Sequence, residues 1–435
     1  MERLEPETLR EILTRAVGAD RADRAVPAFF TPAFVSVRRH PSKTDAAFAG
    51  HFGPGAAPVP WNPLGLLLEK RPSFTLDPLL HAGCYYVQDS SAMYVGEVFR
   101  RAAGGLDVPG RPVRVLDLCA APGGKSTDLA ASLRAAFGDG FLLVANEVMR
   151  DRAGILADNL ALWGDPCTAV TSADPKAFAA LEGFFDAIVA DVPCSGEGMF
   201  RKDPVAVRAW SEDHVRHCAA RQRRILSDVW PALRTGGILV YSTCTFEEAE
   251  NDALVEWAAG QLGAEVLPVP AFPQLVPTRT GALLVPGFVP GEGQFAAVLR
   301  KTAPAAAWRA PRGKAPARAE ELRYVPESIA ADLASLQFLR PLRAGTPLGV
   351  RKGTDLVPDP DAALLIGEDR TGCPAVEVDA ATALHFLHGD ALRLPDAPKG
   401  FVRICHEGHP LGFVKNLGNR CNNLHPARRR IRMDV

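Results

Sequence analysis

Five short apolar runs between residues 113 and 243 constrain the fold of this chain most strongly. The runs are Val113–Leu118, Phe141–Asn146, Cys167–Thr171, Phe185–Ala190 and Gly237–Thr243. Helix-length stretches separate most of them, and strands that alternate with helices form a parallel sheet covered by helices on both faces. We therefore predict a doubly wound α/β domain over residues 94–302, with Phe295–Arg300 as a late antiparallel strand.

Smaller units are predicted on either side of this domain. Apolar residues repeat at helical spacing from Leu9 to Val17, and Val35 and Val37 alternate as in a strand, so residues 1–93 are predicted to form a small α+β domain. Prolines among many alanines predict a linker over residues 303–320.

A third domain is predicted over residues 321–435. It contains strand-like pieces at Phe401–Cys405 and Leu411–Val414, with a turn at Glu407-Gly408 between them. The last 21 residues hold five arginines and one aspartate, which leaves open a solvated tail or a surface that contacts phosphates. The five arginines are Arg420, Arg428, Arg429, Arg430 and Arg432.

Composition excludes several classes of protein. The 435 residues are 47% hydrophobic and 23% charged, as in ordinary soluble globular proteins, and no membrane span or signal peptide is predicted. Nine scattered cysteines without paired spacing predict reduced thiols in a cytoplasmic protein and no metal site. The net charge of −1 argues against a uniformly basic nucleic-acid binder.

A glycine loop follows the first apolar run. In the segment Val115–Thr127, Gly123 and Gly124 allow a ligand to approach the backbone, and a helix N-terminus follows. A P-loop would require glycine where Cys119 stands, and the dinucleotide pattern Gly-x-Gly-x-x-Gly is absent. The ligand that we consider instead is S-adenosylmethionine, which carries two charges and a ribose diol.

Two acidic residues follow the next two apolar runs. Glu147 stands where an acceptor for a ribose diol is expected, although a surface glutamate is an equal alternative. Asp174 suits a contact with adenine or ribose, and its alternative role is to cap the segment that begins at Pro175.

Two cysteine motifs suggest chemistry on a pyrimidine. Cys194, in Asp191-Val-Pro-Cys, and Cys244, in Tyr241-Ser-Thr-Cys, both follow strand-like runs. Cytosine C5 is a weak nucleophile, and a thiolate added at C6 turns the ring into an enamine with carbanion character at C5. Buried structural cysteines are the alternative, and this reasoning alone does not say which cysteine attacks.

Charged residues near these motifs have candidate roles. Asp191 ends its strand, where it could hydrogen-bond the cytosine amine or N3, although a turn residue is the alternative. Lys125 is a candidate cation that favours a thiolate. Phe200, Arg201 and Lys202 suit a polyanionic substrate with an exposed base, and a solvated loop is equally consistent.

Together these motifs resemble the NOL1/NOP2/Sun family of RNA cytosine-C5 methyltransferases. The resemblance rests on Ala120–Ser126, Asp191–Gly196, Ser242–Thr245 and the approach segment Tyr86–Ala92. In the last domain, Pro410–Asn416 and Asn423–Pro426 are similar to the PUA-like RNA-binding unit of the bacterial F-type members, which act on 16S ribosomal RNA. The first domain is similar to the family's ferredoxin-like or RRM-like domain.

The resemblance implies a fold and a site. The fold is a Rossmann-like class I methyltransferase with a seven-stranded doubly wound sheet. Cys244 is implied as the nucleophile, Cys194 as the residue that assists elimination, and Asp191 as facing the cytosine. The residues implied to line the S-adenosylmethionine site are Cys119, Ala120, Ala121, Pro122, Gly123, Gly124, Lys125, Glu147, Arg152, Asp174 and Asp191.

The resulting hypothesis is methylation of cytosine C5 in 16S ribosomal RNA through a covalent bond between Cys244 and C6. We expect a cytoplasmic monomer that binds small-subunit ribosomal RNA and needs neither a membrane nor a metal. Two alternatives stay open. One is a transfer-RNA methyltransferase with the same chemistry, and the other is a non-catalytic RNA-binding factor for ribosome assembly.

Overall fold

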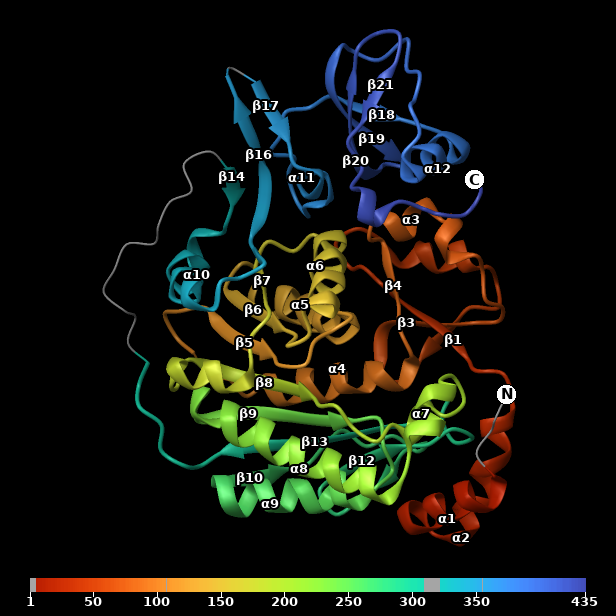
Figure 1. Cartoon of the computed structure of the whole chain (residues 1–435), viewed down its shortest axis with the longest axis vertical. Helices are drawn as coiled ribbons and strands as arrows, with labels where there is room; N and C mark the ends of the chain where they lie inside the picture. The colour runs from red at the N-terminus through yellow and green to blue at the C-terminus, as the bar shows by residue number, and fades with distance from the viewer. Residues whose placement is uncertain (1–4, 107, 309–320, 354) are drawn as a thin grey trace.

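The computed structural model describes residues 5–106, 108–308, 321–353 and 355–435. Most of the linker predicted over residues 303–320 lies outside these described residues. Figure 1 shows the large sheet with its helices in the middle and lower parts of the view. The C-terminal sheets lie above it, and the N-terminal strands and helices run along one side.

A mixed sheet of ten strands forms the centre of the described structure. Its order is β11-β12-β13-β9-β8-β5-β6-β7-β15, and β10 also pairs with β13. Strands β7, β6, β5, β8 and β9 are parallel, whereas β13 pairs with β9 in the antiparallel direction. The strands are β5 (Val113–Asp117), β6 (Phe141–Asn146), β7 (Thr168–Thr171), β8 (Phe185–Asp191), β9 (Leu233–Thr243), β10 (Ala264–Leu267), β11 (Val276–Pro277), β12 (Gly281–Leu284), β13 (Gln294–Lys301) and β15 (Arg343–Ala344).

The five predicted parallel strands and the late antiparallel strand are all confirmed. Nearly every residue in β5 to β8 is buried, which is why these strands appear in the sequence as continuous apolar runs. Strand β9 begins at Leu233, four residues before the predicted Gly237, because Leu233 is buried and pairs with Phe185.

The sheet has three more strands than the seven that the resemblance implies. Strands β11 and β12 extend it beyond β13, and β15 pairs with β7 at the opposite edge. Strands β11 and β15 have two residues each, so they are too short to produce an alternating pattern in the sequence.

Helices cover both faces of the sheet. Helix α4 packs on α5 and α5 packs on α6, while α8 packs on α9 and on η4 (Pro175–Leu181). The helices are α4 (Ser90–Ala103), α5 (Gly124–Phe137), α6 (Arg150–Trp163), α7 (Pro204–Ala209), α8 (Glu212–Val229) and α9 (Asp252–Leu262). This doubly wound arrangement places ligands at the carboxyl ends of the parallel strands.

The N-terminal segment forms an antiparallel sheet in the order β2-β3-β1-β4. Helical segments join β1 to β2 and β3 to β4, which is the β-α-β-β-α-β pattern of ferredoxin-like folds. The elements are α1 (Pro6–Val17), α2 (Ala19–Ala25), β1 (Val35–Arg39), η2 (Ala46–Phe52), β2 (Ala57–Val59), β3 (Asn62–Leu68), α3 (Pro78–His81) and β4 (Tyr85–Val87). The apolar face of helix α1 belongs to the core of the large sheet, through Leu9, Ile12 and Leu13.

The C-terminal segment contains a three-stranded sheet, β14-β16-β17, and a four-stranded sheet, β18-β19-β20-β21. Its elements are β14 (Glu321–Tyr324), α10 (Ala330–Ser335), β16 (Thr346–Lys352), β17 (Asp355–Pro358), α11 (Pro360–Leu364), β18 (Ala375–Glu377), α12 (Ala380–His388), β19 (Gly400–His406), β20 (His409–Asn416) and β21 (Cys421–Asn423). The boundary predicted at residue 321 stays a proposal, because Ile329, Leu333 and Leu339 pack in the core of the large sheet. No helix in the described part of the chain is long and apolar enough to cross a bilayer.

The two ends of the chain share one hydrophobic core. Val37 of β1 and Leu79 of α3 belong to the same buried cluster as Phe386 of α12 and Val402 of β19. Figure 1 shows α3 directly below α12 and the C-terminus. The first and last segments of the sequence are therefore packed together beside the large sheet.

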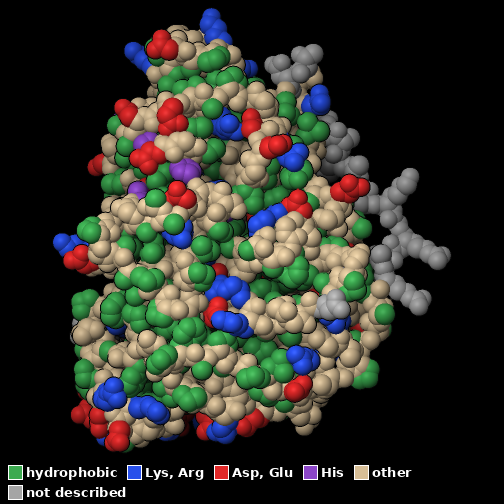
Figure 2. Space-filling view, turned by 180° about the vertical axis from the view of Figure 1, so that it is seen from behind, with side chains coloured by type: hydrophobic (Ala, Val, Ile, Leu, Met, Phe, Trp, Pro, Cys, Tyr) green, Lys and Arg blue, Asp and Glu red, His purple; other side chains and the backbone are tan. Residues whose placement is uncertain are grey.

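The C-terminal arginines are not a uniform basic surface. The side chain of Arg429 is only 6% exposed, and its guanidinium pairs with Asp158 of α6 at 2.8 Å and with Asp361 of α11 at 2.8 Å. Arg428 also reaches Asp158, at 2.7 Å, but its side chain is 66% exposed. On the face shown in Figure 2, Lys and Arg side chains are interspersed with Asp and Glu. Neither predicted role, solvated tail or phosphate contact, therefore describes Arg429.

We predict that Arg429→Met destabilises the protein by about 3 kcal/mol, because it leaves two partly buried carboxylates without their common cation. Thermal unfolding and limited proteolysis of the C-terminal domain would measure the loss. The matched control is Arg428→Met, which removes an exposed ion pair worth about 0–1 kcal/mol. Equal losses of stability in the two variants would contradict this role of Arg429 as the cation shared by Asp158 and Asp361.

Candidate active site

The glycine loop connects β5 to α5 at the carboxyl edge of the parallel strands. Gly123 has φ of 114°, a conformation that residues with a side chain rarely adopt. The loop is tied to neighbouring elements, since Ala120 N–H donates to Asn146 O at 2.8 Å and Asn159 Nδ2 donates to Pro122 O at 2.7 Å. The loop is therefore held in one conformation, and α5 begins directly after Gly123.

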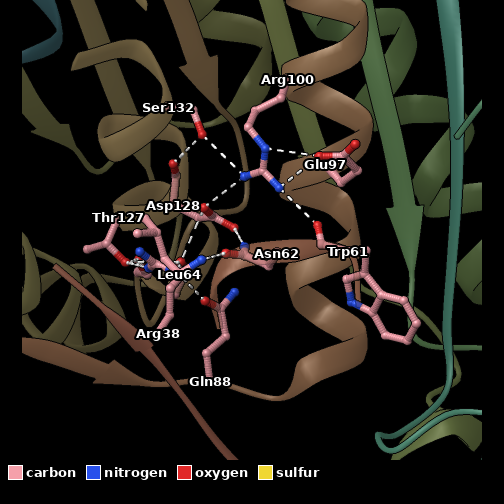
Figure 3. Close-up of polar contacts among 12 residues, drawn as sticks. Arg38, Trp61, Asn62, Leu64, Gln88, Glu97, Arg100, Thr127, Asp128 and Ser132 are labelled. Atoms are coloured by element: carbon pink, nitrogen blue, oxygen red, sulfur yellow. Dashed lines mark hydrogen bonds and ion pairs between the residues drawn. The ribbon is translucent and has the colours of Figure 1, made fainter. Parts of the chain in front are cut away.

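Arg38 of β1 holds the start of α5 from the N-terminal sheet. Its side chain is wholly buried, and Nη2 donates to Gly124 O at 3.1 Å and to Thr127 Oγ1 at 2.5 Å. Its Nε donates to Gln88 Oε1 at 2.9 Å and lies 3.8 Å from Asp128 Oδ1. Figure 3 shows Thr127, Gln88 and Asp128 gathered around the guanidinium of Arg38. Sequence analysis did not identify this role.

Asp128 is the shared acceptor of this buried cluster. It also receives Asn62 Nδ2 at 2.9 Å and Arg100 Nη1 at 3.3 Å, so strands and helices from both domains meet at one carboxylate (Figure 3). A buried carboxylate that accepts several hydrogen bonds fixes the groups around it.

Asp117 is a candidate site residue that sequence analysis did not single out. It ends β5 and is fully buried, and Ser126 Oγ donates to its Oδ2 at 2.6 Å. Among the described residues, its Oδ1 has no hydrogen-bond partner. Burial raises the pKa of Asp117 to about 7. An unpaired buried oxygen beside the glycine loop would accept a donor from a ligand.

The acidic residues after the next two strands differ from each other. Glu147 is 4% exposed and lies at the end of β6, where its Oε1 accepts Met149 N–H at 3.0 Å and its Oε2 pairs with Arg152 at 3.2 Å. Asp174 is 49% exposed and caps η4 by accepting Lys176 N–H at 3.0 Å. Glu147 is therefore built into the site edge, whereas Asp174 has the capping role that the sequence left open.

Asp191 and Lys125 form the central ion pair of the site. Lys125 Nζ lies 2.8 Å from Asp191 Oδ2, and Ser242 Oγ donates to Asp191 Oδ1 at 2.5 Å. Burial opposes the charge on Lys125, but Asp191 outweighs it and holds the pKa of Lys125 above its ordinary value. Gln294 Nε2 approaches Asp191 Oδ1 at 3.3 Å. Lys125 is thus a permanent cation at this edge.

The two cysteines of the motifs are in contact. Cys194 Sγ lies 3.0 Å from Cys244 Sγ, longer than a disulfide bond of about 2.05 Å. Its hydrogen bond to Cys244 and then its burial raise the pKa of Cys194 well above the ordinary value. Cys194 therefore keeps its proton and is placed to donate it to the sulfur of Cys244. The charge of Lys125 acts on Cys244 as well.

Two other sequence predictions need correction or restriction. Arg201, proposed as a substrate contact, has a side chain only 2% exposed and pairs with Glu292 at 2.8 Å. Lys202 is more accessible and pairs with Asp89 at 2.9 Å. Burial raises the pKa of the Cys119 thiol, which opposes its ionisation.

The predicted residues thus gather at one edge of the sheet. Cys119 to Lys125 follow β5, Glu147 follows β6, Asp191 and Cys194 follow β8, and Cys244 follows β9. Arg152 lies at the rim with 49% exposure. The arrangement combines a protonated thiol, a second thiol beside a cation and two buried carboxyl groups, which suits nucleophilic addition by sulfur.

Three family models match the chain. The family described as "16S rRNA methyltransferase RsmB/F" matches residues 109–299. The "Methyltransferase RsmF PUA domain" matches residues 373–431, and the "N-terminal domain of 16S rRNA methyltransferase RsmF" matches residues 6–90. These matches agree with the predicted order of an N-terminal domain, a Rossmann-like domain and a PUA-like domain.

Relatives of similar length are found in bacteria. Ribosomal RNA small subunit methyltransferase F of Cronobacter sakazakii is 31% identical over 97% of this chain and 95% of the relative. The protein of the same name from Enterobacter sp. strain 638 is 32% identical over 85% of this chain and 83% of the relative.

Solved structures share the fold. A methyltransferase homologue from Pyrococcus horikoshii is 26% identical, with a TM-score of 0.56, over 68% of this chain and 100% of that chain. NSun6 from the same organism, solved with SFG, has a TM-score of 0.55 and 17% identity over 68% of this chain and 98% of that chain. The predicted Rossmann-like methyltransferase fold is confirmed.

We predict that Arg38→Met lowers the stability of the protein by about 3 kcal/mol, because a buried ion-pair network loses one of its cations. Hydrogen exchange should also increase in the first turn of α5, where Gly124 O and Thr127 lose their donor. Thermal unfolding with hydrogen-exchange mass spectrometry would measure both effects. Arg39→Met is the control, since Arg39 makes an exposed contact with Asp45 O. Unchanged exchange in α5 would refute this role of Arg38.

Proposed function

The chain belongs to the 16S rRNA methyltransferase RsmB/F family, and on that premise we propose that it methylates carbon C5 of a cytosine in 16S ribosomal RNA. The methyl donor is S-adenosylmethionine, and the reaction proceeds through a covalent bond between Cys244 Sγ and cytosine C6. The single observation that carries the proposal is the 3.0 Å contact between Cys194 and Cys244 beside the Lys125–Asp191 pair.

The residues of the glycine loop fit S-adenosylmethionine. The unpaired Oδ1 of Asp117 suits the ammonium group of the methionine end, and the N-terminus of α5 lies beside it. Glu147 is buried at the end of β6, where it suits the ribose hydroxyls, and Arg152 borders it. When bound there, S-adenosylmethionine supplies an electrophilic methyl group.

The cysteines divide the covalent chemistry. Cys244 adds its sulfur to C6, and the electron pair of the C5–C6 double bond makes C5 nucleophilic. Asp191 supports the amidine edge of the ring, and Lys125 holds Asp191 in place. After C5 is methylated, a base or water removes the C5 proton, the C6–S bond breaks and the double bond re-forms. Cys194, which keeps its proton, assists the departure of the Cys244 sulfur.

The accessible surface for RNA is not a single basic patch. Arg201 and Arg429 are engaged in ion pairs, and Lys202 is partly exposed next to the site. We propose that the C-terminal PUA domain and the site edge contact the ribosomal RNA together.

We predict opposite outcomes for the two cysteines. Cys244→Ala should abolish methyl transfer, because no sulfur is left to activate the ring. Cys194→Ala should accumulate a protein–RNA conjugate, because addition still occurs while release of the sulfur is impaired. The measurements are transfer of labelled methyl to 16S ribosomal RNA and a denaturing gel that resolves the conjugate.

The control is Cys373→Ala, the same change in the C-terminal domain, which should leave methyl transfer unaffected. Methylation that survives in Cys244→Ala would reject the covalent mechanism. Label that enters transfer RNA and not 16S ribosomal RNA would reject the substrate but keep the chemistry. Bisulfite mapping of the labelled RNA then tests position C5.

A further inference from the structure

Two buried glutamates lie in the segments that follow the Cys194 and Cys244 loops. Glu197 follows the Cys194 loop in η5 (Glu197–Met199), and Glu250 lies in η7 (Glu248–Glu250), which follows the Cys244 loop. Both are fully buried, and no ion pair joins either of them to a cation among the described residues. Two unpaired carboxylates this close in an apolar interior would be costly.

The two carboxyl groups share one hydroxyl. Ser195 Oγ lies 2.8 Å from Glu197 Oε1 and 3.0 Å from Glu197 Oε2, and it also makes a short hydrogen bond with Glu250 Oε1. A serine hydroxyl has one proton to donate. It can serve only one of these carboxylates, so the second contact requires a proton on a carboxyl oxygen.

The other donors around the pair come from Trp210, Gln222, the backbone of Ser195 and Thr245, whose side chain hydrogen-bonds the Glu197 carboxylate. Trp210 Nε1 donates to Glu197 Oε1 at 2.5 Å, while Gln222 Nε2 donates to Glu250 Oε2 at 2.6 Å. Ser195 N–H approaches Glu250 Oε2 at 3.2 Å. These contacts satisfy Oε2 of Glu250 and leave Oε1 as the oxygen that faces Ser195. A proton on that oxygen completes the chain of donors from Glu250 to Ser195 to Glu197.

The titratable groups that face this pair do not supply a compensating charge. They are Cys194 from the β8 loop, Cys218 from α8, Tyr241 from β9 and Glu247 from the Cys244 loop. Each is either neutral as a thiol or phenol or negative as a carboxylate. Arg221 of α8 acts on Cys218 but makes no ion pair with either glutamate among the described residues.

We propose that Glu197 and Glu250 share a single proton through Ser195, and that this singly protonated pair acts as a positioning device that holds the two cysteine loops at reacting distance. The cluster is joined directly to both loops. Ser195 Oγ lies 3.0 Å from Thr245 Oγ1, and Gly198 N–H donates to Cys244 O at 2.9 Å. Gln222 Nε2 also donates to Pro193 O at 2.9 Å, beside Cys194.

The device makes the cysteine pair sensitive to pH. Burial raises the pKa of Glu250 to about 7 and also raises that of Glu197. When pH rises through that range, Glu250 loses the shared proton, two carboxylates face each other across Ser195, and the loops that carry the sulfurs are driven apart. The negative charge also raises the pKa of Cys194 further. As a role in catalysis, this inference rests on the proposed function of the two cysteines.

The test is the pH profile of methyl transfer to 16S ribosomal RNA by Glu250→Gln. The amide keeps a donor toward Ser195 Oγ and an acceptor toward Gln222 but cannot ionise. We expect the wild-type rate to fall about tenfold per pH unit above the pKa of the shared proton, and we expect Glu250→Gln to lack this descending limb. Glu248→Gln, an identical change at an exposed residue two positions away, is the control and should keep the limb. A descending limb that is unchanged in Glu250→Gln would overturn the proposal.

A second measurement does not depend on activity. The carboxyl of Glu250 has a higher pKa in the folded protein, about 7, than its ordinary 4.5, so the folded state holds a proton that the unfolded chain releases. The stability from this proton is present at low pH and is lost as pH rises toward 7. The thermal midpoint of the wild type should therefore fall relative to Glu250→Gln between about pH 5 and about pH 8.

A constant difference in midpoint over this range would reject the shared proton even if Glu250→Gln were inactive at every pH. The outcome is also separate from that of the proposed function. If Cys244→Ala still methylates RNA while the midpoint difference changes with pH, the mechanism fails and the shared proton stands. If the midpoint difference does not change with pH while Cys244→Ala is inactive, the shared proton is rejected and the covalent mechanism stands.

Discussion

The parallel pairing of β8 with β9 is the constraint on which the rest of the site depends. In this register Asp191 is the partner of Ser242, so the chain leaves both strands at the same edge of the sheet. Both strands are buried along their inner lengths, and a shift of one residue would turn their side chains to the opposite faces. The contact between Cys194 and Cys244 is therefore set by the apolar core and not by the loops alone.

Burial then decides which groups at this edge carry charge. Lys125 remains a cation because Asp191 compensates for its desolvation, whereas Cys194 remains a neutral thiol because its hydrogen bond and its burial both oppose ionisation. Burial without a compensating charge favours the protonated form, and this accounts for the proton proposed between Glu197 and Glu250. These two residues have no cation beside them among the described residues. Near the glycine loop a cation is thus retained beside its carboxylate, whereas near the sulfurs burial without a cation favours protonated groups.

The sequence was sufficient for the features that depend on local pattern. Continuous apolar runs identified the parallel strands, and the rule that ligands lie at strand ends brought Lys125, Asp191 and the cysteines together. Residues whose roles depend on distant partners were missed or misread. Arg429 meets Asp158 across 271 positions, and Arg201 meets Glu292 across 91, so both looked like exposed charges. Arg38 and Glu250 were missed for the same reason, because a buried ionisable residue is recognisable only from its partners.

Strand β1 contacts both the core shared by the two ends of the chain and the glycine loop. Side chains alternate along a strand, and Val37 therefore points into the core shared with the C-terminal domain while Arg38 points to the start of α5. The C-terminal domain is fixed a second time by Arg429, which pairs with Asp158 on the helix that follows Glu147. A domain that binds RNA is thus attached to the sheet edge through two elements that border the glycine loop. Movement of that domain relative to the large sheet would have to break a shared apolar core and a buried ion pair, so this geometry favours a rigid platform over a hinged arm.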